Sequence, residues 1–178
     1  MNETIDPMKK TTLTFGLLSG LIIIAYSVVV FLWMGEDITV EKFAVAEMLG
    51  FLRYVILLLA IFFTLWTMRK RSEGGISFGR LFKEGFFVAV IAALFVGAME
   101  AVYLSVYPGF MEQAQSIYIE RMVADGATAT ELAEMKDQME AFAWMQKPAL
   151  SGLFYFFETL LVGTVGAVLM GLFLKRKA

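Results

Sequence analysis

Four long apolar runs constrain this chain more than any other feature of its sequence. They cover about residues 13–34, 48–68, 85–107 and 148–174. At a rise of 1.5 Å per residue, each run makes a helix of roughly 30 Å or more, which matches the hydrocarbon core of a bilayer. The runs are apolar around their whole circumference, which is not typical of a surface helix in a soluble domain. The sequence therefore predicts an all-α fold, an integral membrane four-helix bundle, as a single membrane domain over residues 1–178.

Composition excludes most common enzyme chemistry. The chain has no cysteine and no histidine, so thiolate nucleophiles, disulfides and imidazole acid–base catalysis are excluded. A metal site would need carboxylates alone, which is unusual. Basic residues gather at the ends of the apolar runs, and the largest polar segment is acidic, which argues against nucleic acid as a partner. We therefore expect no enzyme activity, no cofactor and no metal.

Small residues recur at every fourth position of the third run. A row of this kind lies on one side of a helix, and in lipid small residues let two helix backbones approach closely. The fourth run carries a row of its own, and we expect the two rows to meet in a packing seam. The proposed seam consists of Gly85, Ala89, Ala93, Gly97, Ala101, Ser105, Thr159, Gly163, Ala167 and Gly171.

The polar segments between the runs differ in character. Residues 1–12 form a polar head that begins at Met1, or at Met8 if Met8 is the native start. We expect residues 35–47 to form a short acidic connection. The basic residues 69–84 contain a Gly-Gly break, after which residues 77–84 can form a short amphipathic turn. Its apolar side chains, expected to face lipid, are Phe78, Leu81 and Phe82.

The segment from 108 to 147 is the only sizeable polar region and predicts two helices. The first covers about residues 110–124. The sequence from Thr128 to Glu131 fits a capping box, which predicts a second helix ending near Met145. We expect the pair to fold back as a helical hairpin onto the end of the bundle or onto the membrane surface.

Positive charge alternates between the two sides of the predicted bundle. The chain ends and residues 69–84 hold ten of the fifteen Lys and Arg residues, whereas residues 35–47 and 108–147 hold four. Cytoplasmic segments carry the excess of positive charge in membrane proteins. The sequence therefore predicts that both termini and residues 69–84 are cytoplasmic and that the hairpin, residues 108–147, is extracytoplasmic.

These segments also resemble a known family. Residues 74–79, read as GGISFG, are followed by Phe82, Lys83, Glu84 and Gly85. With Pro108 after the third run and the basic end of the chain, they resemble the central signature of DUF4199, a bacterial family of unknown function. The resemblance implies a four-helix protein of the bacterial inner membrane. It implies no activity, because the family has no assigned catalytic or binding residues.

Three charged residues fall inside the predicted membrane runs: Arg53, Glu100 and Glu158. Each charge costs roughly 2.5–3.5 kcal/mol on insertion scales, so such groups pair or line a cavity. All three lie at roughly 8–15 Å below the same boundary, which allows Arg53 to pair with one or both glutamates. The cluster is either an ion pair that fixes helix register, or a proton, ion or small-solute site.

The basic cytoplasmic residues suggest contact with membrane lipid. Arg69, Lys70, Arg71, Arg80 and Lys83 can hold anionic head groups, or they can serve orientation alone. The leading functional hypothesis is a non-enzymatic membrane protein that acts through a partner, either a second copy or another membrane protein, or through envelope organisation. The alternative is a small ion, proton or solute transporter or channel that uses the charged cluster.

Overall fold

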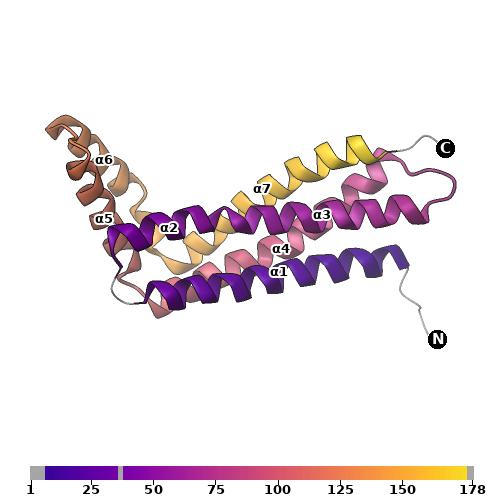
Figure 1. Cartoon of the computed structure of the whole chain (residues 1–178), viewed down its shortest axis with the longest axis horizontal. Helices are drawn as coiled ribbons and strands as arrows, with labels where there is room; N and C mark the ends of the chain where they lie inside the picture. The colour runs from indigo at the N-terminus through magenta and orange to yellow at the C-terminus, as the bar shows by residue number, and fades with distance from the viewer. Residues whose placement is uncertain (1–6, 36–37, 176–178) are drawn as a thin grey trace.

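A computed structural model gives the structure of this chain and describes residues 7–35 and 38–175. Those residues form helices and no β-strand. Four helical segments are long and apolar enough to cross a membrane: Met8–Met34, Val40–Arg71, Phe78–Val106 and Pro148–Leu174. The prediction of an all-α protein built on four membrane-type helices is confirmed (Figure 1).

The helices follow one another with short connections. They are α1 (Pro7–Met34), α2 (Val40–Gly50), α3 (Leu52–Arg71), α4 (Phe78–Val106), α5 (Phe110–Ala124), α6 (Ala129–Ala141), a 3₁₀ turn (Ala143–Gln146) and α7 (Pro148–Leu174). Figure 1 shows α1, α3, α4 and α7 along the long axis of the molecule, with α2 continuing the line of α3. The start of α1, the end of α7 and the α3–α4 loop lie at one end, and the α5–α6 hairpin projects from the other.

The most extensive helix contact joins α4 to α7. A Cβ atom added to Gly163 would lie 2.5 Å from Ala89 Cβ, and one added to Gly97 would lie 2.6 Å from the carbonyl oxygen of Gly152. The two small-residue rows therefore face each other, and Gly152 extends the α7 row beyond the predicted residues. Ser105 does not take part, because α7 begins only one turn before Gly152. Ser105 is exposed, and its hydroxyl donates to the Ala101 carbonyl at 2.7 Å.

Helix α1 docks on the opposite side of α4. Its two glycines leave room for large α4 side chains: a Cβ on Gly16 would lie 2.8 Å from Ile91, and one on Gly20 would lie 2.5 Å from Phe95. Because these glycines have no side chain, Ile91 and Phe95 pack directly against the α1 backbone. Small residues bring membrane helices together in this way.

Three helix starts lie earlier than predicted. Helix α1 begins at Pro7, inside the expected polar head. Helix α2 begins at Val40, inside the expected acidic connection, because the Thr39 hydroxyl accepts a hydrogen bond from the Lys42 amide at 3.2 Å. Ser77 caps α4 in the same way through the Arg80 amide. These short-range caps start helices before the apolar run itself begins.

The prediction that residues 77–84 form a lipid-facing turn is wrong. These residues cap and begin α4, and their apolar side chains pack into the bundle. Leu81 is fully buried, and the ring of Phe78 lies against Gly171 of α7, next to Phe82. The reason is the early start of α4, which brings these side chains onto the α7 seam. Arg80 and Lys83 remain exposed, as expected.

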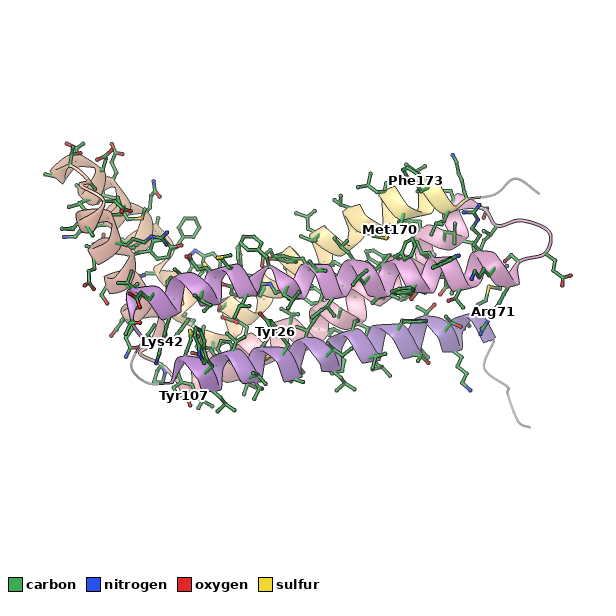
Figure 2. The ribbon with its side chains drawn as sticks, viewed as in Figure 1. Tyr26, Lys42, Arg71, Tyr107, Met170 and Phe173 are labelled. Carbon is green, nitrogen blue, oxygen red and sulfur yellow. The ribbon has the colours of Figure 1, made fainter. Side chains whose placement is uncertain are left out.

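The outer surface of the four long helices is strongly apolar. Leu32 of α1 is 74% exposed, Leu161 of α7 is 66% exposed and Phe173 is 89% exposed, pointing away from the ribbon in Figure 2. A surface of this kind is too apolar for water and suits the acyl chains of lipid.

Helix α5 docks the hairpin on the bundle. Ala114 and Ile117 are buried, and the Tyr118 ring meets Phe43 of α2 edge-on with 5.6 Å between ring centroids. The Tyr118 hydroxyl donates to Glu47, which raises the pKa of Tyr118, and Arg121 forms an ion pair with Glu47 at 3.4 Å.

Helix α6 has no buried residue, so α5 makes the bundle contact that was predicted for the hairpin, and contact of the hairpin with the membrane surface stays a prediction. Its capping box is confirmed: the Thr128 hydroxyl accepts from the Glu131 amide, and the Glu131 carboxylate accepts from the Thr128 amide at 2.7 Å. Helix α6 ends at Ala141, before the predicted Met145, and a 3₁₀ turn carries the chain to α7.

Candidate functional site

A cavity of about 530 Å³ lies between α1, the α2–α3 junction, α4, α5 and α7, at the hairpin end of the bundle. Its polar lining consists of Tyr26, Ser27, Glu47, Arg53, Tyr54, Glu100, Tyr103, Gln115, Tyr118, Tyr155 and Glu158. Apolar side chains complete the wall, among them Phe31, Val96, Met99 and Phe110. A concave site with mostly apolar walls and a few convergent polar groups is typical of ligand-binding pockets.

The turn between α2 and α3 shapes one wall of this cavity. The helix is interrupted at Phe51, whose amide bonds to the Met48 carbonyl at 3.3 Å. On the other side of the cavity, the Tyr26 hydroxyl of α1 donates to the Leu49 carbonyl at 2.6 Å. Figure 2 shows Tyr26 between α1 and the α2–α3 line of helix. This bond ties α1 to the junction just before Arg53, at the start of α3.

Arg53 and Glu158 form the centre of the polar wall. Arg53 Nη2 lies 3.0 Å from Glu158 Oε2. The Tyr54 hydroxyl accepts from Arg53 Nη2 at 2.6 Å and donates to Glu158 Oε1 at 2.5 Å, so the three side chains close a ring of hydrogen bonds. The guanidinium also lies over the rings of Tyr54 and Tyr155, 4.7 and 5.0 Å from their centroids. Contacts of this length are cation–π interactions.

Glu100 lines the same cavity but is not part of this ring. It interacts electrostatically with Arg53 and Glu158. Among the residues that the structure describes, it makes no hydrogen bond within 3.5 Å and no ion pair within 4.0 Å. The structure thus brings Arg53, Glu100 and Glu158 to one cavity and joins Glu158 to Arg53.

Sequence reasoning missed the tyrosines of the site. Tyr54 follows Arg53 directly, Tyr103 lies three residues after Glu100, and Tyr155 lies three residues before Glu158. Residues three apart share a helix face, so this spacing could have identified Tyr103 and Tyr155. The Tyr103 ring stacks on Phe31 at 3.7 Å between centroids and meets Phe110 edge-on at 5.0 Å, which joins α1, α4 and α5 around the cavity.

The other half of the bundle is closed by packed side chains. Leu57, Ile61, Leu65 and Val88 are fully buried there, and the α4–α7 seam runs beside them. The cavity is therefore a pocket that enters one half of the bundle, and the core fills the other half. In the described part of the chain, no group of three His, Cys, Asp or Glu residues could hold a metal ion.

The basic residues lie at the far end of the bundle from this cavity. Arg69, Lys70, Arg71, Arg80 and Lys83 are all exposed. Two of them contact neighbouring side chains: Arg71 Nη1 donates to Thr11 at 3.1 Å, and Lys70 Nζ lies 4.4 Å from the centre of the Trp66 ring. Their contact with lipid head groups stays a prediction.

An all-helical bundle with four membrane-length apolar helices, a lipid-compatible surface and a pocket between helices defines an integral membrane protein. Residues 14–176 match the family described as "Protein of unknown function (DUF4199)". The chain belongs to this family, as its resemblance in sequence predicted. No curated protein and no solved structure matches the chain.

Proposed function

We propose that this protein is a non-enzymatic membrane protein that acts by binding, with the cavity at the hairpin end as its binding site. One observation carries the proposal: a 530 Å³ cavity, the size of a small-molecule site, contains the ionisable residue Glu100 without an ion-pair partner in the described chain. An ionisable side chain inside a membrane bundle is costly when charged and marks functional sites. The Arg53–Glu158 pair forms a fixed wall of this site.

Native mass spectrometry of the protein released from nanodiscs tests this proposal. Ala46→Trp places a large ring in the cavity wall, and Ala98→Trp makes the same change on the exposed outer face of α4 as its control. We expect a non-covalent adduct on the original protein and on the Ala98→Trp variant, and its loss in the Ala46→Trp variant. Retention of the adduct in both variants, or no adduct on any form, contradicts the proposal.

The second candidate function is transport of a proton, ion or small solute. The closed ring of Arg53, Tyr54 and Glu158 beside Glu100 favours it, because linked ionisable groups inside membranes form relays. The packed core beyond the cavity argues against a pathway through one copy. We expect liposomes that contain the protein to show no proton or monovalent-ion flux. Flux that is lost when Glu100→Gln is combined with Glu158→Gln replaces the binding proposal with transport.

We further propose the orientation that charge asymmetry predicts, in the bacterial inner membrane. Both chain ends and residues 69–84 are cytoplasmic, and residues 108–147 with the cavity are extracytoplasmic. The shared end of α1, α7 and the α3–α4 loop supports this (Figure 1). The chain has no cysteine, so single cysteines report directly. An impermeant maleimide should label Glu134→Cys in intact cells and Glu73→Cys only after permeabilisation, and the reverse pattern contradicts the orientation.

A further inference from the structure

We propose that the occupant of the cavity is an organic cation, an ammonium group carried on an apolar body. This inference rests on the proposed binding function and specifies its ligand. It follows from three properties of the cavity: the balance of its charges, the aromatic character of its walls and its volume.

The charges of the lining favour a cation. Three carboxylates, those of Glu47, Glu100 and Glu158, face one guanidinium among the described lining residues. Glu158 is engaged by Arg53 at 3.0 Å, and Glu47 is engaged at the rim by Tyr118 and Arg121. Among the residues that the structure describes, Glu100 has no cationic group within 4.0 Å. An anion would meet uncompensated negative charge, because the guanidinium already has its carboxylate.

The aromatic residues suit the same ligand. The faces of aromatic rings carry partial negative charge and attract ammonium and guanidinium groups. The cavity already shows this interaction once, where the Arg53 guanidinium lies over Tyr54 and Tyr155. Tyr103 and Phe110 extend the aromatic wall beside Glu100. An ammonium group near Glu100 would therefore meet a carboxylate and aromatic rings together.

The volume of the cavity indicates more than a bare ion. About 530 Å³ falls within the range of small-molecule sites. The rest of the lining is mostly apolar, with Ile23, Val30 and Met99 among its residues. A ligand that fills this space must bring an apolar body with its charge. Two sources supply this chemistry: a free amine, or the ethanolamine head group of a phospholipid with part of its chains.

A matched set of probes tests the charge preference. The protein is placed in nanodiscs of phosphatidylglycerol, which contain no amine lipid, and titrated by calorimetry at neutral pH. The probes are 2-phenylethylamine, protonated at this pH, neutral 2-phenylethanol and the anion 3-phenylpropanoate, which share a phenyl group and a short chain. We expect the amine to bind at least about tenfold more tightly than the alcohol, and the anion to show no binding.

Matched variants locate the binding. Glu100→Gln should weaken amine binding about tenfold or more, because it removes the charge that the ammonium meets. Glu134→Gln makes the same change on exposed α6, outside the cavity, and should leave the affinity unchanged. If Glu100→Gln fails to fold, the amine-to-alcohol ratio on the original protein decides the question by itself.

The remaining outcomes separate the inference from the proposed function. Equal affinity for amine and alcohol, or full affinity in Glu100→Gln, overturns the cation. If no probe binds but the native adduct is still lost in Ala46→Trp, the cation is wrong and the binding function stands; if there is no adduct either, both fall. With binding established, phosphatidylethanolamine in the nanodisc identifies the source: weaker amine binding indicates a lipid head group, and unchanged binding indicates a free amine.

Discussion

Replacing Gly97 by alanine tests the seam on which this fold depends. The added Cβ would lie 2.6 Å from the Gly152 carbonyl oxygen and 3.0 Å from Phe156 Cβ, where ordinary contacts begin at 3.4 Å. The carbonyl belongs to the α7 backbone, so no side chain can rotate away. Restoring an ordinary contact requires α4 and α7 to separate locally by about 0.8 Å.

Gly79→Ala is the matched control in the same helix. A Cβ on Gly79 meets nothing within 4 Å. Both substitutions gain helix propensity, up to about 1 kcal/mol in a helix interior, with a smaller gain in the first turn at Gly79. Only Gly97→Ala carries the cost of overpacking, about 1–3 kcal/mol. We therefore expect Gly97→Ala to be less stable than Gly79→Ala by about 1–3 kcal/mol, less any difference in propensity.

Reversible unfolding in mixed micelles of mild detergent and dodecyl sulfate, followed by circular dichroism, measures this difference. Gly97→Val should continue the trend, because it adds two more carbon atoms at the same contact. If Gly97→Ala is as stable as Gly79→Ala, α4 and α7 do not meet closely at Gly97, and the small-residue seam does not hold them together there.

Further predictions address the site and the hairpin. Glu158→Gln should destabilise the bundle by about 1–3 kcal/mol in the same unfolding assay: breaking a buried pair costs about 3–5 kcal/mol, but these side chains are 21% and 33% exposed. Joining Glu158→Leu with Arg53→Met should cost less than either change alone; a sum of the two costs would refute coupling. Thr128→Ala should remove about 1 kcal/mol of α6 stability, and α6 amides should then exchange faster than α5 amides. The hydrogen bonds from Thr128 lower the pKa of Glu131, so the carboxylate stabilises α6 at a pH above the usual glutamate pKa, and this stabilisation is lost as pH falls below it. The protection of α6 amides from hydrogen exchange, corrected for the intrinsic exchange rate, should therefore fall at low pH. Unchanged amide protection at low pH contradicts this prediction. The raised pKa of Tyr118 means that its contribution to docking is present below about pH 10 and is lost as pH rises further; Tyr118→Phe should remove this pH step from spin-label distances between α2 and α5.

The membrane-type helices and the hairpin were predictable because each depends on local sequence. A helix satisfies its own backbone hydrogen bonds in lipid, so length and apolarity of one segment are sufficient to indicate a span. The capping box at Thr128 and Glu131 is likewise complete within four residues. Helix starts at Thr39 and Ser77 were missed, because the apolar runs mark what enters lipid and a capped helix can begin before them.

The choice of partner for Arg53 was not predictable. Sequence placed Glu100 and Glu158 at similar depths, and depth depends only on the number of residues along each helix. The rotation of α4 and α7 about their axes decides which carboxylate meets the guanidinium, and the close glycine contacts set that rotation. Tyr54, the next residue after Arg53, completes the ring because its hydroxyl bonds to both Arg53 and Glu158.

The sequence by itself determined the class of this protein: four apolar helices, two rows of small residues, a basic and an acidic side, and membership of a family of unknown function. These features belong to single segments, whose burial and hydrogen bonding follow from their own residues. The cavity was decided by tertiary structure alone. It lies between α1, the α2–α3 junction, α4, α5 and α7, with Tyr26, Tyr103 and Arg53 in its wall, while small residues hold α4 close to α1 and to α7. No single segment of the sequence predicts this cavity, because it depends on how several helices are placed relative to one another.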